Sequence, residues 1–148
     1  MFYASFLSPL GTVTVTTNGA AVIAVGFSEA PITSPSCALA THAADQLQAY
    51  FNGQLQHFDV PLAASGTAFQ QRVWQALLAI PYGKTASYKD IATRLGDVNA
   101  VRAVGMANAR NPIAIIVPCH RIIGSDGSLT GYAGGLAKKQ WLLQHERG

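Results

Sequence analysis

The sequence predicts an α/β protein, with a small N-terminal α/β domain over residues 1–62 and a mainly helical C-terminal domain over residues 63–148. Three observations support this division. Strand and turn signals fill the first part, helix-start signals repeat in the second, and a stretch of small residues at 61–66 reads as a linker between them. A chain of 148 residues is long enough for one or two small domains, each with a core.

The two parts also differ in charge. Residues 1–60 contain three acidic residues and no Lys or Arg, a formal charge of −3. Residues 61–148 contain all ten basic residues and four acidic ones, a formal charge of +6. Such an asymmetry indicates that the second part alone meets a polyanion. Basic residues scattered over a solvated surface are the alternative explanation.

Strands come first in the N-terminal part. β-branched and aromatic residues alternate with polar ones in three segments: 2–7, 12–17 and 20–27. Asn18-Gly19, between the last two segments, is typical of a tight hairpin turn. A helix is predicted over Leu39–Phe51, because Leu47 and Tyr50 lie on one apolar face and Asn52-Gly53 provides a stop.

The C-terminal part opens with a helix whose start is well marked. Thr67 is a suitable N-cap, and Gln70 three residues later completes a capping box. Pro81-Tyr82-Gly83 ends this helix. Between these signals, apolar residues recur at helical spacing at Phe69, Val73, Trp74, Leu77 and Ile80.

Two shorter helices follow, and together they form a helix-turn-helix candidate. Ser87 and Asp90 make a second capping box, and Gly96 ends the helix that they start. Another helix is predicted over 99–109, and Arg110-Asn111-Pro112 ends it. Two short helices joined by a turn are typical of DNA-binding helix-turn-helix motifs. The same arrangement also serves as plain core packing, so this motif alone is a weak indication of DNA binding.

A thiol stands beside an imidazole after the next apolar run. Residues 113–117 are all apolar and predict a buried strand, and Pro118-Cys119-His120-Arg121 follows directly. An ordinary thiol has a pKa near about 8.5, so a nucleophilic Cys119 needs a nearby base or cation, and His120 is the candidate. Neighbouring side chains of an extended chain point to opposite sides, so their contact requires a local turn or a bridging water. A buried, unreactive cysteine next to a hydrogen-bonded histidine is the alternative.

Eight stretches of the second part together make a specific arrangement: 69–74, 80–83, 87–88, 102–105, 110–112, 116–121, 131–136 and 141–146. In them the sequence resembles the O6-alkylguanine-DNA alkyltransferases, the methylated-DNA–protein-cysteine methyltransferases, and most closely their bacterial form. The resemblance covers about residues 67–146 without a gap. Residues 1–60 match only in general character, as a ribonuclease H-like α/β domain.

The resemblance implies DNA repair by direct reversal of damage. Such a methylated-DNA–protein-cysteine S-methyltransferase moves the alkyl group of O6-alkylguanine in double-stranded DNA onto its own cysteine, here Cys119. The transfer happens once per protein, because the thioether that forms is a poor leaving group. No cofactor is expected. The range of alkyl sizes, activity on O4-alkylthymine and cooperative binding along the DNA stay open.

The resemblance also implies which residues carry the chemistry. Cys119 is the nucleophile, a water joins it to His120, and Glu146 orients the imidazole and stabilises its charged form. Tyr88 drives rotation of a DNA phosphate and donates a hydrogen bond to guanine N3. Asn111 caps nearby turns and ties the recognition helix to the active site.

Contacts with DNA are expected from the helix-turn-helix. Arg102 matches the arginine that fills the place of the rotated nucleotide, whose extrusion costs a few kcal/mol. The resemblance adds Ala103, Gly105 and Arg110, together with Tyr88. The many small residues of the second helix suit the minor groove, where base readout is degenerate. Taken alone, Arg102 would be a solvated helix residue and Tyr88 a core aromatic.

A base pocket is implied beside the cysteine, lined by Tyr132, Ala133, Val117 and Pro118. Tyr132 would stack on the base. Ala133 stands where some relatives have serine, so recognition of the O6 position would depend on backbone N–H groups.

Metal binding and a membrane location are not expected. Some relatives hold zinc in the N-terminal domain, but this segment offers only Cys37, His42 and His57, and we predict no metal site. Both cysteines are predicted to be free thiols, because disulfides are rare inside cells. No apolar stretch approaches the ~20 residues of a membrane span, and no signal peptide is evident. We expect a cytoplasmic monomer.

Two other functions remain as alternatives. A lesion sensor that binds damaged DNA without repairing it, like the alkyltransferase-like proteins, usually has tryptophan at the cysteine position, so Cys119 argues against it. A Cys-His-Glu hydrolase generally places its base far away in sequence and needs an oxyanion hole, which Pro118 before the nucleophile does not indicate.

Overall fold

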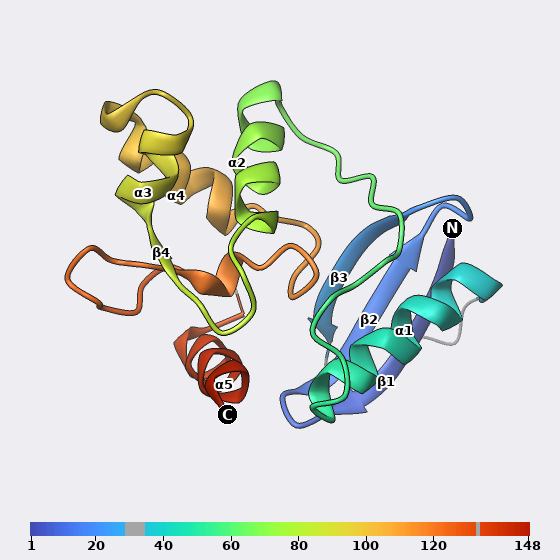
Figure 1. The fold of residues 1–148 in the computed structure, drawn as a ribbon. Coiled ribbons are helices and arrows are strands. Elements are labelled where there is room, and N and C mark those ends of the chain that lie inside the picture. Colours follow the sequence, from blue (N-terminus) through green and yellow to red (C-terminus); the bar gives the residue numbers. More distant parts are fainter. Residues whose placement is uncertain (29–34, 133) are drawn as a thin grey trace. The chain divides into compact units, whose positions relative to one another are not determined.

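Residues 1–28, 35–132 and 134–148 are described by the computed structural model of this chain (Figure 1). They form two units, Met1–Ser65 and Gly66–Gly148. The first unit is a small sheet with one helix and the second is mainly helical, so the predicted α/β class and the order of its two parts are confirmed.

The first unit is an antiparallel sheet covered by a helix. Its strands pair in the order β1-β2-β3, with bounds β1 Phe2–Ser8, β2 Gly11–Thr17 and β3 Val22–Ser28. The helix α1, Ala38–Phe51, packs against β1 and β2 and buries Leu47 and Tyr50. The turn predicted at Asn18-Gly19 is confirmed, because Asn18 Oδ1 accepts the backbone N–H groups of Ala20 and Ala21 and Gly19 has φ +93°.

The segment expected to be a plain linker contributes to this sheet. Leu62 forms a parallel bridge with Val22, which donates its N–H to Pro61 O at 2.8 Å and accepts from Ala63 N at 2.9 Å. The linker prediction is therefore wrong for residues 61–63. Small side chains indicated a loop, but the backbone of the segment still pairs with the edge strand β3.

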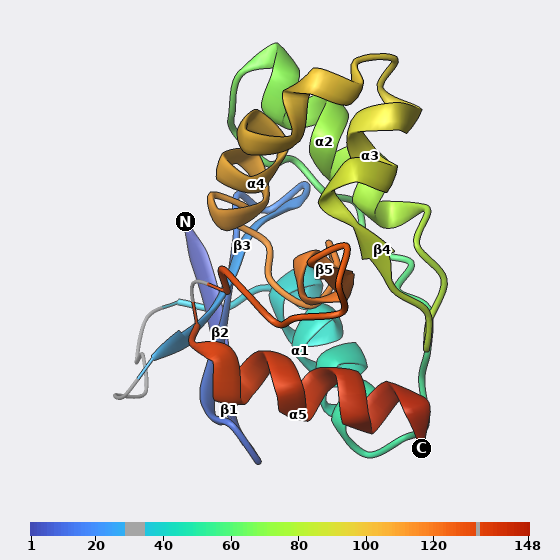
Figure 2. The same cartoon turned by 90° about the vertical axis from the view of Figure 1, so that its left-hand side faces the viewer.

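The second unit contains four helices among the described residues. Their bounds are α2 Ala68–Leu78, α3 Tyr88–Arg94, α4 Val101–Ala109 and α5 Leu136–Arg147. Both predicted capping boxes are present, Thr67 with Gln70 and Ser87 with Asp90. Two 3-10 turns complete the unit, η1 Val98–Ala100 and η2 Cys119–Arg121, with a short parallel pair of β4 Ala86–Ser87 and β5 Ile122–Ile123 (Figure 2).

The predicted helix-turn-helix is formed by α3 and α4, which pack against each other. The second helix begins two residues later than expected, because the 3-10 turn η1 precedes it. Asp97 caps that turn by accepting the N–H of Asn99 at 3.0 Å. A hydrogen bond also connects α4 to α2, because the indole N–H of Trp74 on α2 donates to Ala107 O at 2.8 Å.

The strand predicted over 113–117 is wrong. These residues form consecutive turns, in which Ile116 N bonds to Ala114 O at 2.8 Å and Val117 N bonds to Ile113 O at 3.1 Å. Ile115 even has φ +71°, a left-handed conformation that is rare for a β-branched residue. Most of the run is buried, and an unbroken apolar run gives the same signal for a buried strand as for a buried turn.

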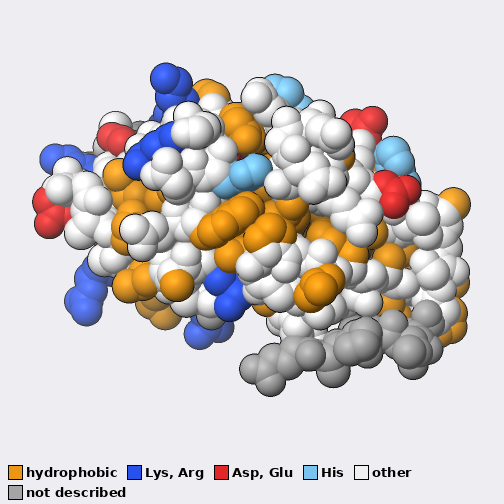
Figure 3. Space-filling model, turned by 90° about the horizontal axis from the view of Figure 1, so that it is seen from below, with side chains coloured by type: hydrophobic (Ala, Val, Ile, Leu, Met, Phe, Trp, Pro, Cys, Tyr) orange, Lys and Arg blue, Asp and Glu red, His pale blue; other side chains and the backbone are white. Residues whose placement is uncertain are grey.

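The charge asymmetry of the sequence follows the two units. All Lys and Arg side chains visible in Figure 3 belong to the second unit, because the first has none. Both cysteines are free thiols, as predicted. Among the described residues, no helix combines the length and apolar composition that crossing a membrane requires.

Candidate active site

The reactive thiol predicted from the sequence lies in the 3-10 turn η2. Cys119 is 7% exposed, and its N–H donates to Val117 O at 2.8 Å. The turn closes with a bond from Arg121 N to Pro118 O at 3.0 Å. Cys119 and His120 are therefore on a tight turn, not on an extended chain, which is the first of the two alternatives for their contact.

His120 is fully buried and faces a carboxylate. Its Nε2–H donates to Glu146 Oε2 at 2.7 Å, and Glu146 lies in the last turn of α5. The other ring nitrogen, Nδ1, has no hydrogen-bond partner within the described ranges. Because Nε2 carries the proton in this arrangement, Nδ1 is left as the acceptor that a general base requires.

Arg121 completes this buried cluster. Its guanidinium group donates to Glu146 twice, from Nε at 2.8 Å and from Nη2 at 3.0 Å. A third bond runs from Nη1 to Ile80 O at 2.7 Å, and the guanidinium also lies over the Tyr82 ring at 5.7 Å. The Glu146 carboxylate is thereby kept paired in a buried place, where an unpaired charge would be strongly destabilising.

Burial and hydrogen-bonded neighbouring groups shift the pKa values of Cys119 and His120 in opposite directions. Burial raises the pKa of the Cys119 thiol, while a hydrogen bond from Asn111 and the Lys139 charge lower it. Burial also lowers the pKa of His120, and the hydrogen bond and charge of Glu146 act in the opposite direction. In the resting protein these shifts favour a thiol and a neutral imidazole, which become charged together if the proton moves from Cys119 to His120.

Asn111 organises the turn that leads to the cysteine. Its Nδ2 donates to Val117 O at 2.9 Å and to Ile113 O at 3.2 Å, and its Oδ1 accepts Ile113 N at 3.0 Å. Asn108 on α4 adds a longer bond to Cys119 O at 3.4 Å. These two asparagines connect the end of α4 with the backbone of the turn and of Cys119.

Tyr88 lies at the start of α3, directly after β4. Its hydroxyl contacts Thr130, at 3.3 Å from the carbonyl oxygen and 3.2 Å from Oγ1. A Cβ on Gly131 would lie 3.3 Å from the same hydroxyl, and Gly131 has φ +61°. The Tyr88 ring also borders Gly105 of α4, so the backbone approaches Tyr88 closely on both sides.

The remaining residues predicted to contact DNA lie on α4 and at its end, and none of them is buried. Val104, Ala107 and Asn108 are buried, whereas Gly105 is only partly exposed. The exposed face of the helix and its end carries Arg102, Ala103, Met106 and Arg110. This face combines two guanidinium groups with the small Ala103 and with Met106, a large apolar side chain that is 61% exposed.

The predicted base pocket is described only in part. Tyr132, Val117 and Pro118 are buried, and the Tyr132 hydroxyl has no hydrogen-bond partner within the described residues. Burial and the neighbouring Cys119 raise the pKa of Tyr132. Ala133 lies outside the described residues.

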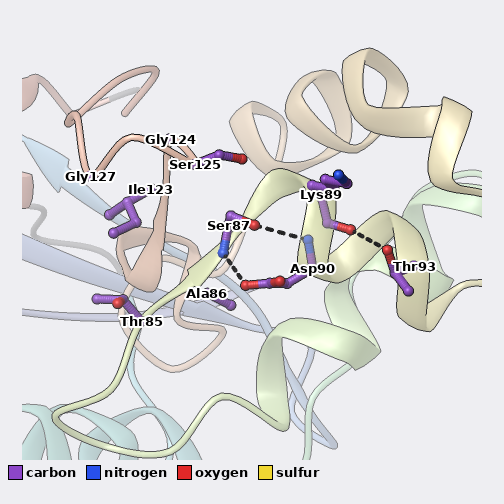
Figure 4. Close-up of a pocket in the computed structure, with 10 residues that line it drawn as sticks. All are labelled: Thr85, Ala86, Ser87, Lys89, Asp90, Thr93, Ile123, Gly124, Ser125 and Gly127. Carbon is purple, nitrogen blue, oxygen red and sulfur yellow. Dashed lines mark hydrogen bonds between the residues drawn. The ribbon is translucent and has the colours of Figure 1, made fainter.

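A separate pocket of about 500 Å³ lies between α3 and the turn after β5 (Figure 4). Three of its polar side chains have local partners. Ser87 and Asp90 form the capping box, and Thr93 donates to Lys89 O at 2.8 Å. Cys119, His120 and Glu146 are absent from its lining. Within the described ranges, no three His, Cys, Asp or Glu side chains gather as a metal site would require.

Two residues of this region were missed by sequence reasoning. Arg121 was part of the Cys-His motif but received no role, and Lys139 was not considered. Lys139 is fully buried and donates to Thr130 O at 2.8 Å. Helical spacing provided a signal, because Lys139 shares one face of α5 with the buried Leu142, Leu143 and Glu146.

Family profiles match nearly the whole chain. The profile described as "6-O-methylguanine DNA methyltransferase, DNA binding domain" matches residues 68–148. The profile described as "6-O-methylguanine DNA methyltransferase, ribonuclease-like domain" matches residues 1–64.

Known proteins agree with these matches. A methylated-DNA–protein-cysteine methyltransferase of Mycobacterium tuberculosis is 48% identical, over 98% of this chain and 92% of the relative. One from Methanosarcina barkeri is 62% identical over 70% of this chain and 66% of its own length. The crystal structure of Mycobacterium tuberculosis OGT in complex with DNA has a TM-score of 0.91 and 49% identity, covering 99% of this chain and 93% of that one. The chain therefore belongs to the methylated-DNA–protein-cysteine methyltransferase family.

Proposed function

We propose that this protein repairs DNA by direct reversal, transferring the alkyl group of O6-alkylguanine to Cys119 in a single turnover. The observation that carries the proposal is the buried His120–Glu146 hydrogen bond of 2.7 Å, next to Cys119 in the same 3-10 turn. A nucleophile, a base and a group that orients the base are thus adjacent, as nucleophilic catalysis by a thiol requires.

The reaction begins with a proton. A water between Cys119 Sγ and His120 Nδ1 would carry the thiol proton to the imidazole, whose Nε2–H remains bonded to Glu146. The thiolate then attacks the alkyl carbon. The sulfur–carbon bond forms as the carbon–O6 bond breaks, and the bonding electrons pass to the guanine. The guanine takes up a proton from the solvent and the imidazolium returns one to it, so the thiol proton is balanced. Glu146 stabilises the imidazolium that forms with the thiolate.

The guanine must leave the base stack before the thiolate can reach it. We assign this step to Arg102, which is exposed on α4 and free to enter the vacated place. Tyr88 would give up its contact with Thr130 and donate to guanine N3, which makes the leaving base less anionic. Tyr132, Val117 and Pro118 would line the pocket for the rotated base.

In this proposal the protein binds DNA mainly through the phosphate backbone of the DNA. The second unit carries all ten basic residues, and the exposed α4 face carries Arg102 and Arg110 beside the small Ala103 and the larger Met106. Small residues allow a close approach to the minor groove, where sequence readout is degenerate. We further propose that the protein acts as a monomer and that binding depends little on sequence.

A turnover count tests the function. The protein is mixed with a tenfold excess of duplex containing one O6-methylguanine, and the guanine restored per protein is measured at long times. One repaired base per protein is expected. Many repaired bases per protein would indicate a regenerating enzyme, and bound but unrepaired duplex would indicate a lesion sensor.

A further inference from the structure

Met106 is the largest apolar side chain exposed on the helix-turn-helix, and the proposed mechanism gives it no role. It lies in the second half of α4, and its exposed fraction is 61%. A single exposed apolar residue is ordinary on a protein surface, so exposure alone does not assign a function to it. The position of Met106 on the helix, next to groups that we assign to DNA, is what points to a partner.

Met106 lies at the centre of the outward face of α4. Residues four apart in an α-helix lie on one face, because one helical turn contains about 3.6 residues. Arg102, Met106 and Arg110 are spaced by four and are all exposed, and the buried residues of α4 lie on the opposite side. The Met106 side chain is therefore located between the two guanidinium groups, about one helical turn from each.

The other side chains around Met106 on this face are short. Ala103 and Ala109 are exposed, and Gly105 has no side chain. Short residues allow the helix backbone to come close to DNA, so a longer apolar side chain among them reaches further into the groove. Methionine is unbranched and has three rotatable bonds, which lets it adapt to a narrow space. Met106 is thus the apolar group of α4 that extends furthest toward a bound duplex.

The distance along α4 from Arg102 to Met106 places Met106 beside the lesion. Four residues rise about 6 Å along a helix axis, and stacked base pairs are about 3.4 Å apart. With Arg102 in the place of the rotated nucleotide, Met106 lies at the first or second base pair next to it. In the minor groove, a G·C pair differs from an A·T pair by the N2 amino group of guanine. An apolar side chain packed over that donor would remove its hydration without replacing the hydrogen bond.

We propose that Met106 is a specificity-determining residue for repair, whose side chain packs in the minor groove against the base pairs next to O6-alkylguanine and disfavours guanine there. Apolar side chains, methionine among them, pack against base steps in other minor-groove proteins. This inference rests on the proposed function and deepens it. It agrees with binding through the phosphate backbone, because a preference confined to one or two base pairs leaves the phosphate contacts of the site unchanged.

The test replaces guanine by inosine beside the lesion. Inosine pairs with cytosine but lacks the N2 amino group, so an I·C pair keeps the major-groove edge of G·C and loses only the minor-groove donor. O6-methylguanine duplexes carry I·C or G·C at the first or second pair on either side of the lesion. The second-order rate constant of single-turnover transfer is measured for each duplex. We expect the wild type to repair the inosine duplex faster, on the side of the lesion where Met106 lies.

Three variants separate the side chain from the duplex. Inosine also weakens base pairing, but this changes the cost of base rotation for every variant alike, so the I·C to G·C rate ratio is compared between variants. The ratio of the wild type should exceed that of Met106→Ala about 3- to 10-fold. Met106→Leu, which keeps an apolar side chain of similar size, and Leu7→Ala, which removes an exposed apolar side chain from the first unit, should follow the wild type. Equal ratios for the wild type and Met106→Ala at every position would overturn the proposal.

Affinity keeps the role of Met106 testable apart from repair. Binding is measured to unmodified duplexes made entirely of I·C or of G·C pairs, which need no lesion, and the preference of the wild type for I·C should again exceed that of Met106→Ala. Such a preference without any alkyl transfer by the wild type would contradict the proposed function and support the groove contact of Met106. Transfer by the wild type with no effect of Met106→Ala on either preference would support the proposed function and overturn this inference.

Discussion

Replacing Glu146 by glutamine tests how the imidazole is held. The carboxylate accepts hydrogen bonds from His120 Nε2 at 2.7 Å and from Arg121 at 2.8 and 3.0 Å. The glutamine side chain would keep the shape, but it would leave the buried Arg121 guanidinium without its counter-charge. Breaking a buried ion pair costs about 3–5 kcal/mol, so we expect Glu146→Gln to lower the free energy of unfolding by about 3 kcal/mol.

The effect on the rate follows from the imidazolium. A hydrogen bond to a charged group contributes about 1.5–3 kcal/mol, and each 1.4 kcal/mol changes a rate about tenfold. Transfer by Glu146→Gln at neutral pH should therefore be roughly 10- to 100-fold slower. Because Glu146 raises the pKa of His120 against the effect of burial, its loss makes the imidazole a weaker base. The rise of the rate with pH should move to higher pH.

Single-turnover quench experiments from pH 6 to 9 measure this rate, and urea unfolding measures the stability. Arg147→Gln is the matched control, because it removes an exposed charge from the adjacent position of α5. Binding to unmodified duplex should be nearly unchanged in both variants. A rate for Glu146→Gln equal to that of the wild type across this pH range would refute the role given to the His120–Glu146 pair.

Three further predictions follow from the structure. Arg102→Ala should slow repair of O6-methylguanine in duplex DNA far more than in a short single strand, because only the duplex requires the base to be rotated out of a stack; equal losses would assign Arg102 another role. Asn111→Ala removes three hydrogen bonds from the 113–117 turn. At about 1 kcal/mol per bond, it should lower the free energy of unfolding, measured in urea, by about 3 kcal/mol. The control Asn99→Ala, at an exposed position, should change it little. The free energy of unfolding should fall as the pH drops from 7.5 to 5.5. Burial lowers the pKa of His120 in the folded protein. In the unfolded chain the same histidine takes up a proton below about pH 6.5, so lower pH favours the unfolded chain. His120→Gln should flatten this dependence, and a slope that persists in the variant would contradict the assignment.

Local signals in the sequence predicted local structure well. The two capping boxes were predicted because each depends on residues three positions apart, and both are present in full. The hairpin turn at Asn18-Gly19 was predicted for the same reason. Such features need no knowledge of the distant chain.

Features that depend on distant partners were predicted less well. The run 113–117 was expected to be a strand, but its turns are held by the Asn111 side chain and by burial, which a count of apolar residues does not distinguish from a strand. Leu62 was placed in a linker because its pairing with Val22 spans forty residues. The parallel pairing of β4 with β5, which brings Tyr88 near the segment after Cys119, had no local signal either.

In the candidate site, too, residues with a local signal were predicted and residues that depend on distant partners were not. Cys119 and His120 were found because they are adjacent, and Glu146 was found through the family resemblance, since neither spacing nor composition points to it. Lys139 was missed because a Lys-Lys pair ordinarily lies on a solvated surface. Only the packing of the second unit buries that lysine.

The site of alkylation tests the central claim most directly. The protein is incubated with one equivalent of O6-methylguanine duplex, and its intact mass and its peptides are then measured by mass spectrometry. We predict that the protein gains the mass of one CH2 group, located on Cys119, while Cys37 stays unmodified. A methyl group on any other residue, or restored guanine in the DNA with an unmodified Cys119, would contradict the account.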